Sequence, residues 1–393
     1  MNKTIIKLLL ISTLLAIGCA TIEESSFLKP GGTPKPETSE AGMWMQVEKI
    51  EEKIQTSGSL ATDERLNSYI KKLVCDLAND YCSDIRVYIL KVPAFNASMY
   101  PNGMMNIWTG LLLRVQNESQ LAAVLGHEIT HYIKRHSIKR FIDLKNKANV
   151  FALFNTALAT GGVFYRVDTR GLSNLTSLGL HGSIAAYSRD HEREADEGGL
   201  DLLLKEGYSP EGAPEIWENI IKEQDASGAQ AGSLFLASHP PSDERIENLR
   251  KRAKETKIKG TPKIGEKKFL ENILNHRSEW FLQELGLKKF AEMEVVLQNL
   301  AFSPLHKGEL HFLKGELIRK KREKDYSPKA LAQFQKAIDL DPQDPRPRKA
   351  IGLLLLKTDQ NKRASENLNK YLELKPDAED SSVIKSYLKK IKL

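Results

Sequence analysis

Two histidines four residues apart, with a glutamate after the first, stand in the segment "LGHEITHYIKRH" at residues 125–136. On an α-helix, residues four apart leave the same face, so His127 and His131 can bind one metal ion. Glu128 is rotated by about 100° from His127 and can reach a water molecule beside that ion. Two neutral imidazoles and a carboxylate base are what a zinc-dependent hydrolase requires. The spacing therefore predicts a catalytic zinc centre.

A zinc site of this kind needs a third protein ligand. His136 comes one position too early for the extended three-histidine motif and would lie on another face of the same helix. Downstream, residues 187–203 read "YSRDHEREADEGGLDLL" and are expected to form a helix with Glu192 and Asp196 on one face. Glu192 is the predicted ligand, and Asp196 would accept a hydrogen bond from a ligating histidine. Glu194 is the competing ligand, and a solvated acidic helix is the alternative for this stretch alone.

The elements around this motif alternate between helical and extended patterns. Helices are expected at 43–57 and 62–78, a strand at 85–92, and two short strands, "ASMY" and "MMNIW", around a "PNG" turn. A helix then begins near Asn117 or Ser119, with Leu121, Val124, Leu125 and Ile129 on its buried face. Residues 148–186 are apolar but interrupted; they predict two core helices or, alternatively, a surface that rests on a membrane.

The C-terminal region repeats with a period of 34 residues. The pairs at this spacing are Ala330 and Ala364, Phe334 and Leu368, Ile338 and Leu372, and Pro342 and Pro376. Gly352 lies twelve residues before Ala364, where the first helix of a repeat needs a small residue. Gly315 lies fifteen residues before Ala330, so the earlier repeat is expected to carry three extra residues near "KDYSP". This is typical of tetratricopeptide (TPR) repeats, which stack into an α-solenoid with a concave binding face. Segment 270–302, with Trp280, is a candidate first repeat, and an irregular helical bundle is the alternative.

The N-terminus "MNKTIIKLLLISTLLAIGCA" has two lysines, a short apolar run and small residues before a cysteine. This is the pattern of a secretion signal, expected to end at residue 18. "AIGC" resembles the cleavage box of bacterial lipoproteins, which makes Cys19 the predicted lipidated residue. Residues 19–42 would be a flexible tether. Ala20, by resemblance to Gram-negative lipoproteins, favours the outer membrane; an ordinary signal peptide is the alternative.

The remaining bulk properties limit the function further. The length of 393 residues implies two or more domains. The formal charge of +7 is not accompanied by the motifs of nucleic-acid binders, so no nucleic acid is expected as a partner. Residues 251–269 are rich in lysine and are expected to be a basic linker. Secretion permits a disulfide between Cys75 and Cys82, which requires the helix to end near Asn79; two free cysteines stay open as the alternative.

"HEITHYIKRH", "YSRDHEREAD" and the preceding "NASMYPNGMMNIWTGLL" together resemble the zinc peptidases of the HtpX and CAAX-prenyl-protease type. The closer resemblance is to their periplasmic BepA-like branch, which carries C-terminal TPR repeats. It extends over residues 43–250 and implies one zinc ion per chain, held by His127, His131 and Glu192, with Glu128 as the base. Where that family has "LPGG" this chain has "YPNG", and Asn102 is expected to keep the turn because it tolerates left-handed geometry.

A histidine–proline pair in "ASHPPSDERI" matches a further feature of that family. By this resemblance His239 is a candidate regulatory fourth zinc ligand, and Arg245 is a candidate for stabilising the oxyanion. A plain loop is the alternative for His239.

Together these features predict a mainly α protein. An α+β peptidase domain with a small sheet, at residues 43–250, would be followed by TPR repeats at residues 270–393. The predicted function is a membrane-anchored zinc endopeptidase of the periplasm that acts on unfolded or misassembled envelope proteins. Its TPR domain would bind partners or substrates, with the machinery of outer-membrane protein assembly as a candidate partner. An extended substrate would pair with an edge strand at "MMNIW". The alternative is a TPR adaptor or chaperone for outer-membrane protein assembly with a silent or self-inhibited peptidase centre.

Overall fold

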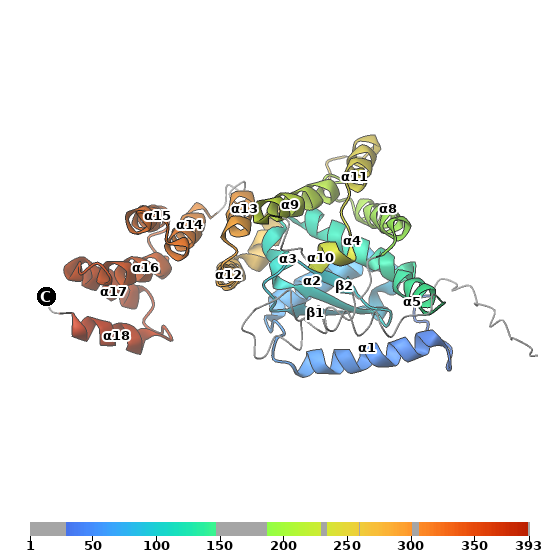
Figure 1. The fold of residues 1–393 in the computed structure, drawn as a ribbon, viewed down its shortest axis with the longest axis horizontal. Coiled ribbons are helices and arrows are strands. Elements are labelled where there is room, and N and C mark those ends of the chain that lie inside the picture. The colour runs from blue at the N-terminus through green and yellow to red at the C-terminus, as the bar shows by residue number, and fades with distance from the viewer. Residues whose placement is uncertain (1–28, 147–186, 229–233, 259, 301–305, 392–393) are drawn as a thin grey trace, which may run out of the picture.

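The computed structural model describes residues 29–146, 187–228, 234–258, 260–300 and 306–391. These residues are mostly helical and include one three-stranded sheet, so the predicted fold class is confirmed (Figure 1). The predicted signal peptide, Cys19 and the segment 148–186 lie outside the described residues.

The elements follow one another in three groups. The first comprises α1 (Ser39–Thr56), α2 (Glu64–Ala78), the 3-10 helix η1 (Asn79–Asp84), β1 (Arg86–Leu90), β2 (Ala97–Met99), β3 (Met104–Trp108), α3 (Thr109–Arg114), α4 (Glu118–Ile133) and α5 (His136–Asn146). The second comprises α8 (Arg189–Lys205), α9 (Gly212–Ser227), α10 (Leu234–Ser238) and α11 (Asp243–Glu255). The third comprises α12 (Glu266–Leu285), α13 (Phe290–Leu300), α14 (Lys307–Lys321), α15 (Tyr326–Leu340), α16 (Pro345–Leu356), α17 (Asn361–Leu374) and α18 (Ser381–Lys390).

The sheet has the strand order β1-β3-β2. β1 runs parallel to β3 with Arg86 opposite Met104, and β2 runs antiparallel to β3 with Met99 opposite Met105. The prediction that the "MMNIW" strand is an edge for substrate is therefore wrong, because β3 is the central strand and β2 lies outside it. Because β3 has a strand on each side, its residues are covered at both edges, which agrees with the burial of all five of them.

The turn between β2 and β3 depends on Gly103, which has φ +87°. A Cβ atom there would lie 2.1 Å from the carbonyl oxygen of Asp84. Asn102 does not take the left-handed geometry predicted for it. Its side-chain amide donates to Glu51 at 2.9 Å, and its side-chain oxygen accepts the Met104 N–H at 3.0 Å. The turn is thus kept by a glycine conformation and by asparagine hydrogen bonds.

Helix α1 covers the face of the sheet opposite α8 and α9 (Figure 1). It begins at Ser39 behind a Thr38 cap, four residues inside the predicted tether, and packs Val47 and Ile54 against residues of the sheet. Buried Glu51 accepts hydrogen bonds from Arg86, Tyr88 and Asn102. Burial alone would raise the pKa of Glu51, but these bonds outweigh it and lower that pKa.

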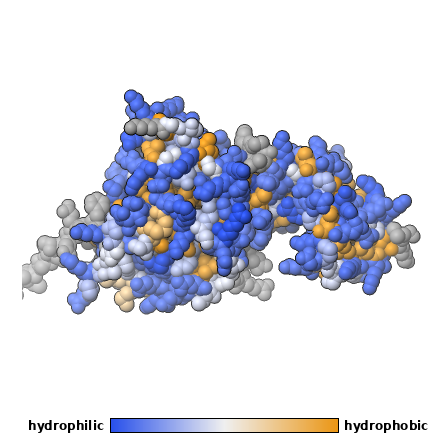
Figure 2. All heavy atoms as spheres, turned by 180° about the vertical axis from the view of Figure 1, so that it is seen from behind, coloured by the Kyte–Doolittle hydropathy of each residue, from blue (hydrophilic) through white to orange (hydrophobic). Residues whose placement is uncertain are grey.

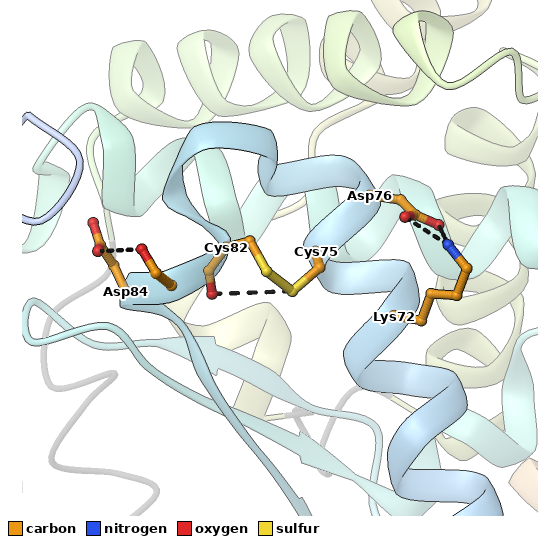
Figure 3. The surroundings of a disulfide bond; sticks show 6 residues. Lys72, Cys75, Asp76, Cys82 and Asp84 are labelled. Carbon is orange, nitrogen blue, oxygen red and sulfur yellow. Dashed lines mark hydrogen bonds and ion pairs between the residues drawn. A yellow bond between two sulfur atoms is a disulfide. The ribbon is translucent and has the colours of Figure 1, made fainter.

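Cys75 and Cys82 form a disulfide (Figure 3). Helix α2 ends at Ala78, and Asn79 turns the chain with φ +50°. The Cα atoms of the two cysteines are therefore 4.5 Å apart, whereas a continuous helix would separate them by about 10 Å. This settles the open choice between a disulfide and two free thiols.

Two successive helix pairs, α14 with α15 and α16 with α17, share one packing pattern. A Cβ atom on Gly315 would lie 2.4 Å from the Phe334 ring, and one on Gly352 would lie 2.6 Å from Leu368. The repeat positions found in the sequence thus occupy equivalent contacts, because each glycine lets the large residue of the second helix approach the first.

The first pair, α12 with α13, instead packs against the peptidase-like part. Buried Arg114 on α3 binds Glu223 on α9 and Glu284 on α12, which fastens the pair to that part.

The predicted basic linker is shorter than expected. Helix α11 continues to Glu255, α12 begins at Glu266, and Lys263 between them donates its N–H to the Gly207 carbonyl at 2.8 Å.

The face shown in Figure 2 is mostly hydrophilic, with hydrophobic residues in separate patches. Within the described ranges, we find no helix that combines the length and the apolar character needed to cross a bilayer.

Candidate metal centre

Helices α4 and α8 supply most of the centre, and glycines stand where they cross. A Cβ atom on Gly126 of α4 would lie 2.8 Å from the Gly199 carbonyl oxygen, and one on Gly199 of α8 would lie 2.6 Å from the His127 nitrogen. The two backbones can approach closely only because neither residue has a side chain. This contact brings Glu192 of α8 to the histidines of α4.

Four side chains converge in the interior. The Nε2 atoms of His127 and His131 are 3.0 Å apart, and His127 Nε2 is 3.1 Å from His239 Nδ1. Glu192 Oε1 lies 3.1 Å from His239 Nδ1 and 3.4 Å from His131 Nε2. One ligand atom from each of the four lies within 4.8 Å of all the others, and each residue is at most 3 % exposed. The structure therefore brings the three predicted ligands, His127, His131 and Glu192, together with His239.

Hydrogen bonds fix which nitrogen of each α4 histidine carries the proton. Nδ1 of His127 lies 3.0 Å from Asp196 Oδ1, so it donates and leaves Nε2 with a lone pair. His136 Nε2 donates to Glu194 Oε2 at 3.0 Å, so its Nδ1 accepts from His131 Nδ1 at 2.9 Å. The hydrogen bonds from Glu194 through His136 to His131 therefore leave His131 Nε2 with a lone pair as well. Burial lowers the pKa of His131 well below its usual value and that of His136 to about 4, so both are neutral.

Two lone pairs that face each other at 3.0 Å repel each other, and a cation bound to both nitrogens would remove this repulsion. Zinc binds histidine nitrogens at about 2.0–2.1 Å in a tetrahedron, which places neighbouring ligand atoms about 3.3 Å apart. Most of the distances between these ligand atoms are 3.0–3.4 Å, and His127 Nε2 lies 3.7 Å from Glu192 Oε2, so the group is close to that geometry. The donor set, with three nitrogens and one carboxylate oxygen, also suits zinc.

Glu128 lies between this group and the sheet. Its Oε2 accepts the Met99 N–H from β2 at 3.1 Å, and its Oε1 lies 3.4 Å from His239 Nε2. Burial raises the pKa of Glu128, which suits a carboxylate that has to take up a proton near neutral pH.

His239 follows α10 and contacts both the ligand group and Glu128. Its backbone N–H donates to the Phe235 carbonyl at 2.7 Å, and its ring stacks on the Phe235 ring at 4.5 Å between centroids. Its Nδ1 faces the ligand group, and its Nε2 faces Glu128. This position is suited to a fourth ligand; that His239 regulates the centre remains a prediction.

Arg245, at the start of α11, has its guanidinium engaged by carboxylates. Nε and Nη2 bind Asp196 at 2.7 and 2.8 Å, and Nη1 lies 2.6 Å from Glu192 Oε2. Burial alone would raise the pKa of Asp196, but the hydrogen bonds from Arg245 and His127 lower it. This arrangement favours a role in orienting Glu192 and Asp196 over the predicted contact with an oxyanion, because Nε, Nη1 and Nη2 are each already bound to a carboxylate.

Sequence reasoning missed the role of His136. It assumed that the helix of His131 continues, which would turn His136 to another face. Instead α4 ends at Ile133 and Arg135 takes φ +57°, so His136 opens α5 and returns to His131. The second histidine of "THYIKRH" was the available signal for His136.

Trp217 on α9 was also missed; the Arg245 guanidinium lies 4.7 Å from its ring centroid.

Replacing His136 with alanine should weaken metal binding about 10–100-fold, since the His131 tautomer would lose its anchor. The measurement is competition with a chromophoric chelator. His191→Ala is the matched control, because the His191 ring stacks on His136 at 4.3 Å between centroids and lies outside this chain of hydrogen bonds. Equal affinity for His136→Ala and the unaltered protein would contradict the role assigned to His136.

Residues 60–253 match the sequence model described as Peptidase family M48. This match identifies a peptidase family M48 domain, which is a metallopeptidase domain, in this part of the chain.

Three curated relatives show where the chain stands in relation to that family. It is 32 % identical over 157 residues to Metalloprotease YcaL of Escherichia coli K12, an alignment that covers 40 % of this chain and 58 % of YcaL. It is 26 % identical over 259 residues to the Beta-barrel assembly-enhancing protease of the same strain, covering 62 % and 52 %. It is 29 % identical over 181 residues to Mitochondrial metalloendopeptidase OMA1 of Schizosaccharomyces pombe, covering 45 % and 50 %. The chain thus spans about half the length of these relatives.

Proposed function

We propose that this protein is a zinc-dependent endopeptidase that acts on unfolded or misassembled proteins of the cell envelope. The observation that carries the proposal is the pair of inward lone pairs on His127 and His131, closed by Glu192 and flanked by Glu128. The name of the Beta-barrel assembly-enhancing protease supports an envelope role by similarity.

The residues have distinct roles in the proposed reaction. Zinc held by His127, His131 and Glu192 would lower the pKa of a water molecule and polarise the scissile carbonyl. Glu128 takes the proton from the water and passes it to the leaving amine. The Met99 N–H, which donates to Glu128 Oε2 at 3.1 Å, orients the carboxylate for this transfer.

Strand β2 is the proposed docking edge for an extended substrate, because it is an outer strand and its Met99 touches Glu128. Its residues are buried here, and Phe95 just before it packs on Phe235 of α10 with ring centroids 5.0 Å apart. A substrate would therefore need α10 and His239 to withdraw. This supports an enzyme that is self-inhibited at rest.

The test is metal analysis of the purified chain together with cleavage of a reduced, unfolded protein. We expect one zinc per chain and cleavage that a chelator stops and added zinc restores. Cleavage that persists after complete metal removal would refute the proposal.

The rival function is a TPR adaptor or chaperone for outer-membrane protein assembly that works with a silent centre. The burial of all four ligand residues and of Glu128 is the observation in its favour. The two functions make opposite predictions for Glu128→Gln, because an adaptor with a silent centre would keep its cellular function in this variant.

We further propose that the chain loses residues 1–18, is lipidated at Cys19 and faces the periplasm from the outer membrane. The lysine-flanked apolar run and "AIGC" support this, as does the Cys75–Cys82 disulfide, which an oxidising compartment favours. Cys19→Ser should move the protein from the membrane fraction to the soluble periplasmic fraction, which fractionation and immunoblotting would measure. An unchanged membrane fraction would contradict lipidation at this residue.

A further inference from the structure

A groove of about 500 Å³ lies between α13, α14 and the start of α15, outside the metal centre. Its floor is apolar and is formed by Leu297, Leu310, Leu317, Ile318 and Tyr326. Leu297 and Leu317 are buried, and the other three are half-buried. The volume falls within the range of about 300–1,000 Å³ that is usual for ligand sites.

The charge around this floor is strongly positive. Four exposed lysines line the groove, namely Lys307, Lys314, Lys324 and Lys329. The described residues of the lining include two carboxylates, Glu294 and Glu323, and both pair with a fifth lysine, Lys321, at 2.7 and 2.8 Å. Five lysines against two carboxylates leave the lining with a net charge of +3, and the four exposed lysines, which these carboxylates do not pair with, can attract an anionic ligand.

We propose that this groove binds an acidic segment of a partner protein, with an apolar side chain on the floor and carboxylates beside the lysines. The inference rests on the binding face predicted for the repeats, and it does not require the proposed peptidase activity. Lysines whose stems pass along an apolar floor keep their ammonium groups in water at its rim, so one segment can satisfy both surfaces.

A protein segment fits this shape better than an anionic lipid surface. The apolar floor is recessed between three helices, whereas a bilayer presents its headgroups over a broad face and its acyl chains beneath them. A bilayer would neutralise the lysines but leave the floor uncovered. A peptide can place one large apolar side chain into the hollow and acidic residues on both sides.

The test uses the full chain with Glu128→Gln, so that the probe is not cleaved during the measurement. The probe is a fluorescein-labelled peptide with a phenylalanine–leucine pair between acidic residues. We expect saturable binding by fluorescence anisotropy, weakened by added salt because exposed charges are screened. A peptide with lysines in place of the acidic residues should not bind, and one with serines in place of the apolar pair should bind at least about fivefold more weakly.

Two double variants of equal charge locate the binding. Lys314→Glu with Lys329→Glu reverses one groove lysine on α14 and one on α15, and should weaken binding about tenfold or more. Lys320→Glu with Lys336→Glu makes the same changes on the same two helices, at exposed lysines outside the groove lining, and should stay within about twofold.

Three results would overturn the proposal. Equal weakening by both double variants would mean that net charge alone attracts the peptide. Binding to phosphatidylglycerol vesicles, lost in the groove variant and without peptide binding, would assign the groove to lipid. The absence of saturable peptide binding would exclude an acidic segment as the ligand. None of these results depends on whether the chain cleaves proteins, so peptidase activity is tested separately.

Discussion

Replacing Glu128 with glutamine should lower the rate of cleavage of an unfolded protein about 10²–10⁴-fold without changing the zinc content. Glutamine has nearly the same shape, and its side-chain oxygen can still accept the Met99 N–H that glutamate accepts at 3.1 Å. It cannot take a proton from water, so the reaction loses its base while the ligands stay in place. Steady-state cleavage and metal analysis of the same preparation would measure both effects.

Glu197→Gln is the matched control, because Glu197 lies exposed on α8 one residue after Asp196 and contacts no ligand. It should leave cleavage unchanged. Full cleavage by Glu128→Gln would remove this residue from the mechanism. If the variant instead lost cleavage but still rescued cells that lack the protein, the adaptor function would be favoured over the peptidase.

Replacing His239 with alanine should raise the cleavage rate, at least about tenfold if the closed state is the dominant one. The imidazole fills the fourth position of the ligand group, 3.1 Å from Glu192 Oε1, and also faces Glu128 at 3.4 Å. Its removal would free a position for water and release the base at the same time. His127, His131 and Glu192 would still hold the metal, because three protein ligands are the usual set of a catalytic zinc site.

The double variant His239→Ala with Glu128→Gln decides whether the new activity belongs to this centre. It should be as inactive as Glu128→Gln alone. Cleavage that is unchanged in His239→Ala, with zinc retained, would show that His239 does not hold the enzyme shut. Loss of zinc from His239→Ala would instead make this histidine an essential ligand.

The site could be predicted from the sequence to the extent that local periodicity governs it. A four-residue step on a helix places His127 with His131, and Glu192 with Asp196, before any tertiary contact is known. The structure brings Glu192 and Asp196 to the histidines as expected. Glu194 turns instead to His136 and Lys134, as the helical rotation from Glu192 required.

The errors lie where a backbone changed direction or a strand found its neighbours. A left-handed residue at Arg135 returned His136 to the centre, and Gly103 took the conformation expected of Asn102. The order β1-β3-β2 moved the "MMNIW" strand from the edge to the middle. Arg245 met two carboxylates from another helix, which a motif in its own loop does not encode.

The chemical groups of the centre and the helical faces that carry them follow from the amino-acid sequence, as does the 34-residue repeat. The distances between these groups, the nitrogen of each histidine that carries the proton and the contact of His239 with Glu128 do not. Side-chain direction along a helix follows from backbone geometry within one turn. Convergence at 3 Å depends on close packing between segments far apart in sequence, as where Gly126 meets Gly199.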